Sequence, residues 1–187
     1  SRVDHCRAPA PGSGPPEISV LIGHRGSERL PLLLGTLESL AAQQGVRLEC
    51  LVIEQDTTPR IQAALPAWVR HIHAPLPDPQ APYNRSHTFN VGAREARSPV
   101  LLLHDNDMLV PTGYARRILQ RIGTGYAVVN PKRFIFYLNP EHSQAVLAHG
   151  APYDEQPAEY IVQNLEAGGS MAITAEAYHR LGGMDES

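Results

Sequence analysis

The chain contains little cysteine, with two residues in 187, Cys6 and Cys50. Cys6 lies in a Pro/Gly-rich stretch and Cys50 in an apolar run, and no C-x-x-C pair occurs. This distribution argues against a disulfide-rich scaffold and against a zinc-ribbon pattern. We interpret Cys50 as a small buried hydrophobic residue.

Positive charge and long apolar runs are also scarce. The formal net charge is −3, so the sequence shows no basic footprint for nucleic acid. The longest apolar runs, such as 100–103, are far shorter than the ~20 residues that cross a bilayer. The first six residues contain no apolar run of the kind found in signal peptides. We therefore expect a protein of the bacterial cytoplasm, with any membrane association made through partners, and keep a lumenal domain as the alternative.

Apolar residues make up 42% of the chain and charged residues 19%, which is typical of a soluble globular domain. The 17 prolines include two clusters, at 9–16 and 75–82. We interpret the first cluster as part of a flexible leader or linker, residues 1–16, and the second as a long loop. Residues 17–187 then form one domain.

Alternating strand and helix patterns predict an α/β fold with a mostly parallel central sheet. β-branched and apolar runs predict strands, and apolar residues at helical spacing predict helices. No clear pattern appears over 131–166. The predicted strands are 18–22, 48–54, 69–74, 100–104, 127–130 and 168–174, and the predicted helices are 28–44, 61–65, 87–96, 112–122 and 175–181.

Three polar segments, 23–27, 54–57 and 105–107, directly follow predicted parallel strands. Ligands of such sheets bind beyond the carboxyl ends of the strands, so we expect these segments to share one functional edge. Asp105 and Asp107 stand two residues apart there and can converge on a hard divalent cation, Mn²⁺ or Mg²⁺. The alternative is a solvated turn or a helix N-cap, where aspartate is common.

Other segments carry weaker signals. Arg85 can bind a phosphate in a forked geometry, and Asn90 and Gly92 are unfavourable inside a predicted helix unless a close approach requires them. Gly168 and Gly169 allow a ligand to lie against the backbone. His71 and His73 share a strand face but lack an evident acidic partner, so we interpret them as ordinary surface or core residues.

The motifs in this order resemble those of inverting glycosyltransferases with the GT-A fold, which is Rossmann-like, and of family two in its wide sense. The similarity is greatest to the β-1,4-galactosyltransferase group and to the galactosaminyltransferase domains of chondroitin-type polymerases. It covers about residues 17–187 and is carried by Ile22-Gly23-His24-Arg25, Val52-Ile53-Glu54-Gln55, Tyr83-Asn84-Arg85-Ser86, Phe89-Asn90-Val91-Gly92, Asp105-Asn106-Asp107-Met108-Leu109-Val110-Pro111 and Gly182-Gly183-Met184-Asp185-Glu186.

The resemblance implies a metal-dependent transferase that moves a sugar from a nucleotide-sugar, most simply a UDP-sugar, to a saccharide or other hydroxyl acceptor. Asp107 would ligate the metal, with Asp105 helping through the metal or the ribose. The implied donor-binding residues are Arg25, Glu54, Asn84, Arg85, Asp105, Gly168 and Gly169. The chain departs from the family pattern at His24, at Tyr83 and at Glu54-Gln55, where many members have paired aspartates.

The general base of the family lies in a W-G-G-E-D-like segment after G-G-F-D-E, and this chain ends at Ser187. We therefore expect a C-terminally truncated donor-binding core, with Asp185 and Glu186 as weak catalytic candidates on a fraying end. A nucleotide-sugar-binding module without transferase activity is the alternative. A nucleotidyltransferase would need a longer glycine-rich first loop than Arg25-Gly26 provides.

Overall fold

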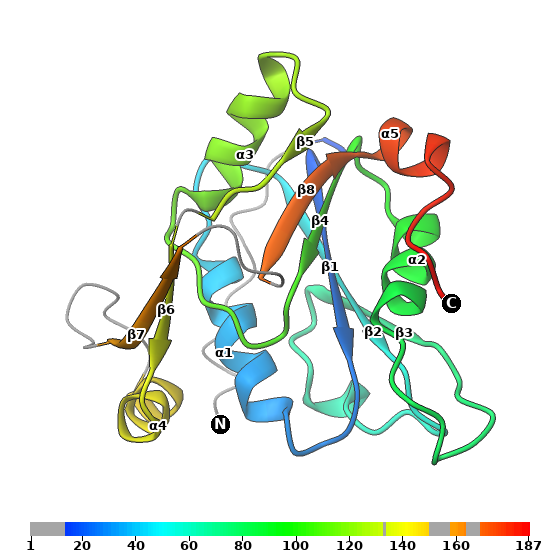
Figure 1. Ribbon diagram of the computed structural model, residues 1–187, viewed down its shortest axis with the longest axis vertical. Coiled ribbons are helices and arrows are strands. Elements are labelled where there is room, and N and C mark those ends of the chain that lie inside the picture. The colour runs from blue at the N-terminus through cyan, green and yellow to red at the C-terminus, as the bar shows by residue number, and fades with distance from the viewer. Residues whose placement is uncertain (1–13, 133, 150–157, 164–168) are drawn as a thin grey trace.

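The computed structural model describes residues 14–132, 134–149, 158–163 and 169–187 (Figure 1). A six-stranded sheet has the order β3-β2-β1-β4-β8-β5. The first four strands of this order run parallel, and β8 is antiparallel to both of its neighbours. The predicted α/β class with a mostly parallel sheet is confirmed. The bounds are β1 (Ile18–His24), β2 (Leu48–Glu54), β3 (Val69–His73), β4 (Val100–His104), β5 (Val128–Val129) and β8 (Ser170–Thr174).

Helices cover both faces of the sheet (Figure 1). The core on one face joins α1 (Leu30–Ala41) and α3 (Tyr114–Gly123) to the sheet, and the other core joins α2 (Arg85–Glu95) and α5 (Ala175–Arg180). Neighbouring strand residues point to opposite cores, as Val20 and Leu21 do in β1. Because both faces are covered, every residue of β1 is buried.

The predicted bounds hold closely where a buried face imposes a pattern. β2 is the predicted 48–54, and β4 is the predicted 100–104. α2 starts at Arg85, two residues before its prediction, because the Asn84 side chain accepts a hydrogen bond from the His87 N–H and caps the helix. The predicted helix at 61–65 is a single 3₁₀ turn, Gln62–Ala64. Cys50 is buried, as predicted.

The segment without a sequence pattern contains regular structure. β6 (Phe134–Leu138) and β7 (Ala158–Gln163) pair as a two-stranded antiparallel sheet, and α4 (Pro140–His149) lies between them in the chain. The sequence of β6 is apolar at all five positions although Phe134, Phe136 and Tyr137 are exposed, so no alternation reveals the strand. The predicted leader, residues 1–16, lies outside the described residues except for its last three.

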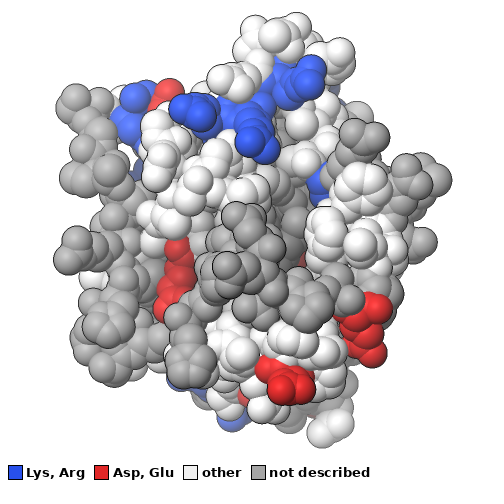
Figure 2. Space-filling view, turned by 90° about the vertical axis from the view of Figure 1, so that its left-hand side faces the viewer, with Lys and Arg blue, Asp and Glu red and all other residues white. Residues whose placement is uncertain are grey.

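Lys and Arg side chains gather at the top of one face of the molecule, where Figure 1 places α3 (Figure 2). The exposed arginines of that helix are Arg116, Arg117 and Arg121. The carboxyl end of β1 lies at the bottom of the view in Figure 1, so this basic patch is remote from the edge that carries the polar segments. Within the described residues, no helix combines the length and apolar character needed to span a membrane.

Gly92 sets how closely α2 approaches the sheet. A Cβ atom at this position would lie 2.8 Å from Ile53 Cδ1 and 3.3 Å from Leu21 Cδ2. Both neighbours are fully buried strand residues and have little room to move. The close approach suspected from the sequence is thus an approach of helix to sheet.

We expect Gly92→Val to lower the free energy of unfolding by about 1–3 kcal/mol, because the added methyl groups overpack this contact. Gly123→Val is the matched control, since a Cβ at Gly123, in the last turn of α3, has no atom within 4 Å. Urea denaturation of both variants checks the difference. Equal losses in the two would mean that α2 can move away from Ile53.

Candidate functional site

The polar segments after β1, β2 and β4 meet at one edge of the sheet, as predicted. β1 lies between β2 and β4, and the three strands are parallel. His24 at the end of β1 is in register with Glu54, and Ile22 is in register with His104. The carboxyl ends of the three strands therefore form a common rim, where ligands of α/β sheets bind.

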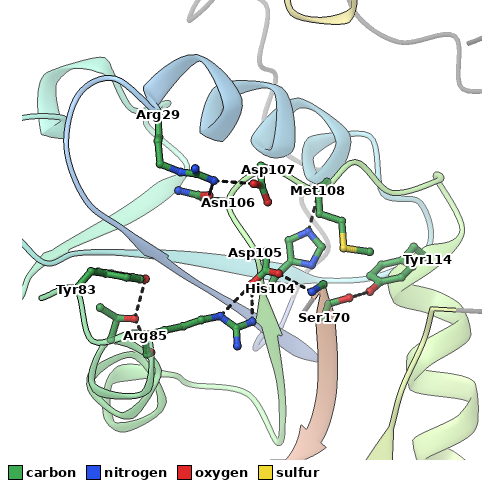
Figure 3. A network of polar contacts seen from close by, with 12 residues as sticks. Arg29, Tyr83, Arg85, His104, Asp105, Asn106, Asp107, Met108, Tyr114 and Ser170 are labelled. Carbon is green, nitrogen blue, oxygen red and sulfur yellow. Dashed lines mark hydrogen bonds and ion pairs between the residues drawn. The ribbon is translucent and has the colours of Figure 1, made fainter. Parts of the chain in front are cut away.

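Asp105 joins three parts of the chain at this rim. Its Oδ1 accepts hydrogen bonds from Arg85 Nη2 at 2.5 Å and Nε at 3.0 Å (Figure 3). Its Oδ2 accepts from the backbone N–H of Gly169 at 2.5 Å, and its own N–H donates to the Gly169 carbonyl at 3.0 Å. The carboxylate thus ties the end of β4 to the first residue of α2 and to the residue before β8.

Asp107 is paired with an arginine that sequence reasoning missed. Arg29 Nη2 lies 2.6 Å from Asp107 Oδ2 and also donates to Asn106 Oδ1 at 3.1 Å (Figure 3). Asn106 Nδ2 in turn lies 3.1 Å from His24 Nδ1, and His24 Nε2 lies 2.7 Å from the Gly26 carbonyl. Because a carbonyl can only accept, Nε2 carries the proton and Nδ1 accepts from Asn106. Burial lowers the pKa of His24, which favours this neutral form.

One signal in the sequence points to Arg29. It stands at the N-cap of α1, where the helix dipole disfavours a cation, and the first turn of that helix contains no acidic residue. A carboxylate close to Arg29 compensates for this placement, and Asp107 supplies it. The pairing joins positions 78 residues apart, so the sequence alone does not reveal it.

His104 lies fully buried behind the acidic segment. Its Nε2 is 3.3 Å from the Met108 carbonyl, and its Nδ1 has no hydrogen-bond partner in the described structure. Burial lowers the pKa of His104 to about 4, so the ring is neutral at pH 7. Beside it, the Tyr114 hydroxyl is hydrogen-bonded to Ser170 Oγ, and burial raises the pKa of Tyr114. These contacts pack α3 and β8 against the base of the rim.

Arg85 and Asn84 occupy the start of α2. The guanidinium carbon of Arg85 lies 4.6 Å from the centre of the Phe89 ring, a cation–π contact that fixes its direction. Asn84 Oδ1 caps the helix, and its Nδ2 donates to the Glu186 carbonyl at 2.9 Å. Asn84 therefore serves the fold here, while Arg85 is 42% exposed beside the rim.

Arg25 and Glu54, predicted as donor-binding residues, each contact other parts of the protein. Arg25 donates to the carbonyls of Ala81 at 2.6 Å and Pro79 at 2.8 Å, and so fastens the proline-rich loop. Glu54 is fully buried, and the Arg60 N–H donates to its Oε1 at 2.8 Å. Both side chains are thus bound within the protein, and their roles at a nucleotide stay predictions.

The expectation that His71 and His73 lack an acidic partner is wrong for His71. Its Nε2 lies 2.7 Å from Glu54 Oε2, in a pair that is almost completely buried. His73 Nε2 lies 2.8 Å from the Asp56 carbonyl instead. Adjacent parallel strands place the His71 ring over the end of β2, which is a tertiary contact that no local pattern encodes.

Gly169 has φ +80°, a left-handed conformation that favours glycine. A Cβ there would lie 2.9 Å from Lys132 Cδ and 3.4 Å from Met108 Sδ. Side chains of the protein therefore fill the space that the sequence suggested for a ligand, and the N–H of Gly169 is used by Asp105. Gly168, predicted alongside it, lies outside the described residues.

Glu186 is held against α2, so the expected fraying of this end is wrong at Glu186. Its Oε1 accepts from Asn90 Nδ2 at 2.6 Å, and its Oε2 lies 2.9 Å from His87 Nδ1. The hydrogen bond from Asn90 has the largest effect in lowering the pKa of Glu186, and the bond from His87 lowers this pKa further. Asp185 is exposed, and hydrogen bonds from Ser187 lower its pKa. A lowered pKa makes both carboxylates weaker bases.

The hydrogen bonds of the Asn90 side chain explain why an asparagine stands inside α2, where it is otherwise unfavourable. Its Oδ1 accepts from the Tyr178 hydroxyl at 2.6 Å and from the Met184 N–H at 2.8 Å. Its Nδ2 donates to the Met184 carbonyl at 2.8 Å as well as to Glu186. One amide side chain thus fastens α5 and the segment after it to α2.

The acidic pair suits a divalent cation only in part. Among the described residues, no three His, Cys, Asp or Glu side chains converge on one point. Carboxylate oxygens are the donors that Mg²⁺ and Mn²⁺ take, and such ions are commonly held by one or two carboxylates together with substrate phosphates and water. Asp107 and Asp105 supply carboxylates of this kind, and each is paired with an arginine in the described structure.

The α/β fold with a mostly parallel central sheet is consistent with a GT-A domain. The model of the family described as glycosyl transferase family 2 matches residues 25–182, and the chain belongs to that family. A comparison with curated proteins found no match. The finer resemblance to the β-1,4-galactosyltransferase group stays a prediction.

Among solved structures, the chain is similar to the mannosyltransferase PcManGT from Pyrobaculum calidifontis, in complex with GDP-Man and Mn²⁺. The TM-score is 0.59 and the sequence identity 16%. The match covers 100% of this chain and 54% of the other, so this chain spans about half the length of that protein. At this identity the likeness shows the fold alone.

We expect the buried His104 to make the domain less stable at mildly acidic pH. The unfolded chain binds a proton at His104 near pH ~6.5, whereas the folded chain binds it only near pH 4. Stability is therefore full above the ordinary pKa and falls by about 2 kcal/mol by pH 5. Urea unfolding at pH 7 and pH 5 measures the loss.

His104→Gln should remove much of this pH dependence. His179→Gln, which changes an exposed histidine of α5, should leave it intact. The same dependence in wild type and in both variants would show that buried His104 is not its source.

We expect Asn90→Asp to release the segment that carries Glu186. The change keeps the shape but replaces a donor by a carboxylate facing Glu186, at a cost of about 1–3 kcal/mol. Hydrogen exchange at the Met184 amide should become roughly tenfold faster or more. Asn130→Asp, at an exposed position after β5, is the control. Unchanged protection of Met184 would mean that other contacts hold the segment.

Proposed function

We propose that this domain is the donor-binding part of a metal-dependent, inverting glycosyltransferase that uses a nucleotide-sugar. The observation that carries the proposal is the position of Asp105 and Asp107 at the carboxyl end of β4, each paired with an arginine at the rim. Membership of glycosyl transferase family 2 supports the transferase chemistry. A saccharide or another hydroxyl compound is the proposed acceptor.

The donor diphosphate is proposed to bind at this rim. A divalent cation held there by Asp107, with Asp105 beside it, would neutralise charge that develops on the departing diphosphate. Arg85 lies next to both a carboxylate and the N-terminus of α2, and both the guanidinium and the helix end attract phosphate oxygens. Arg85 can therefore contact a phosphate oxygen through its remaining nitrogen, Nη1, while Nε and Nη2 stay paired with Asp105.

The residues predicted for the nucleobase take indirect roles in this proposal. Arg25 shapes the wall by holding the proline-rich loop, and the buried Glu54–His71 pair supports the end of β2 beneath it. Gly169 positions Asp105 through its N–H. We retain a UDP-sugar as the donor to test first, and the GDP-Man complex of PcManGT makes GDP the necessary comparison.

Inversion requires the acceptor hydroxyl to attack the anomeric carbon from the side opposite the leaving diphosphate. A base must remove the proton of that hydroxyl from within hydrogen-bond reach. Asp185 is exposed and Glu186 is engaged by Asn90 and His87, and both have lowered pKa values. We therefore propose that these carboxylates do not provide efficient general-base catalysis, and that the domain supplies the donor side of the reaction.

We expect nucleotide binding to depend on a divalent cation and on Asp107. Asp107→Asn should weaken the binding of UDP or GDP in the presence of Mn²⁺ by about 1–3 kcal/mol, the scale of a lost charged contact. Isothermal titration calorimetry with each nucleotide, with Mn²⁺ and with a chelator, measures the effect. Glu176→Gln removes a carboxylate that is 87% exposed on α5 and should have no effect.

If Asp107→Asn binds UDP and GDP with unchanged affinity in the presence of Mn²⁺, the acidic segment is only a solvated turn and the proposal is contradicted. Nucleotide-sugar binding without transfer, to a panel of acceptor sugars and in a longer form of the protein, would favour the binding module instead.

A further inference from the structure

We propose that Arg29 is a counter-cation built into the candidate metal site, and that it couples the binding of the divalent cation to that of the nucleotide. Arg29 pairs with Asp107, and an arriving diphosphate would give its guanidinium a second anionic partner. Arg29 would then release Asp107 to a divalent cation. This inference rests on the proposed function and adds to it a residue with a distinct role.

The carboxylate of Asp107 is already neutralised within the protein. Arg29 Nη2 lies 2.6 Å from Asp107 Oδ2, the distance of a strong charge-assisted hydrogen bond. A dication placed at this carboxylate would lie beside the guanidinium, and like charges this close repel. Binding of the cation alone therefore requires Arg29 to leave without gaining another partner.

The position of Arg29 is fixed by more than the ion pair. Asn106 Oδ1 accepts from the same Nη2 atom, and the Asn106 amide is oriented by its bond to His24. His24 is oriented in turn by the Gly26 carbonyl. This chain of hydrogen bonds has one consistent polarity, so it presents an oxygen to Arg29 and directs the guanidinium to Asp107.

Arg29 is nevertheless free to leave in a way that Arg85 is not. Its side chain is 47% exposed, and the described partners of its guanidinium are Asp107 and Asn106 alone. Arg85 instead donates through two nitrogens to Asp105 and lies over the Phe89 ring. Asp105 also has Gly169 as a second partner, whereas Asp107 is 44% exposed. The pair at Asp107 is the one that can open.

The charges of these two ion pairs balance in two states. Asp105 and Asp107 each face one arginine. A dication added alone leaves a positive excess, while a dication added with a diphosphate restores the balance. The N-terminus of α1 adds to this effect, because its positive end favours the replacement of an arginine by an anion nearby.

The test is the binding of Mn²⁺ in the absence of nucleotide, measured by calorimetry on wild type and on Arg29→Gln. We expect Arg29→Gln to bind Mn²⁺ alone about tenfold more tightly, because the competing cation is gone. By linkage, UDP or GDP should then strengthen Mn²⁺ binding by a correspondingly smaller factor than in wild type. Arg29→Lys keeps the charge and should resemble wild type in Mn²⁺ binding.

Arg47→Gln is the matched control, since Arg47 also pairs with a carboxylate, Glu17, and is 35% exposed, but comes before β2 at the opposite end of the strand. It should leave Mn²⁺ binding unchanged. Circular dichroism of each variant confirms the fold before titration.

Two results would overturn the inference, and they differ. Equal Mn²⁺ affinities of wild type and Arg29→Gln, each strengthened by nucleotide, would leave the proposed function standing and remove the role of Arg29. If neither wild type nor any variant binds Mn²⁺, UDP or GDP, the proposed function is rejected together with the inference.

Discussion

The carboxylate of Asp105 holds together segments that are far apart in the chain. It binds Arg85 at the start of α2 through one oxygen and the N–H of Gly169 before β8 through the other. The parallel part of the sheet, the helix that covers one face and the returning antiparallel strand are therefore joined at one side chain. Since hydrogen bonds to a charged acceptor are strong, this group restrains the rim more than its small size suggests.

Charge balance explains how the rim can be stable and still exchange its ionic partners. Arg29 and Arg85 compensate Asp107 and Asp105, so both carboxylates of the acidic segment are paired in the described structure. The buried histidines behind it, His24 and His104, are neutral because burial lowers their pKa values. The protein thus surrounds a charged surface with a neutral, hydrogen-bonded support, which favours exchange of ionic partners without rearrangement of the sheet.

The sequence predicts best the strands that are buried on both faces, because burial leaves a run of apolar residues in the sequence. β2 and β4 contain the buried apolar runs 50–53 and 100–103, and the bounds of both strands and the polar segments after them agree with the prediction. Asp105 and Asp107 are predicted as site residues in the same way, by their place after a strand. The pairing of Arg29 with Asp107 and of His71 with Glu54 depends on which strands become neighbours, and local residue patterns do not contain that information.

The predictions for Arg25, Glu54 and Gly169 rest on residue type and local sequence pattern alone. Each residue type suits a ligand, but the protein can satisfy the same groups internally, and it does so with loop carbonyls, with His71 and with Asp105. β6 and β7 were missed because their apolar residues do not alternate and several are exposed. Only the tertiary packing shows whether such a side chain is bound within the protein and whether such an apolar segment forms a strand.

The chain leaves the sheet after β5 and returns to it at β8, beside the place that it left. β5 ends at Val129, β8 begins at Ser170, and Val129 pairs with Ala172, so the chain departs and returns beside itself. Changes of length or sequence between these points leave the register of the other strands untouched. Evolution can therefore vary the length of this excursion while the register of the scaffold strands is inherited unchanged, provided that Gly169 at its end keeps its hydrogen bond to Asp105.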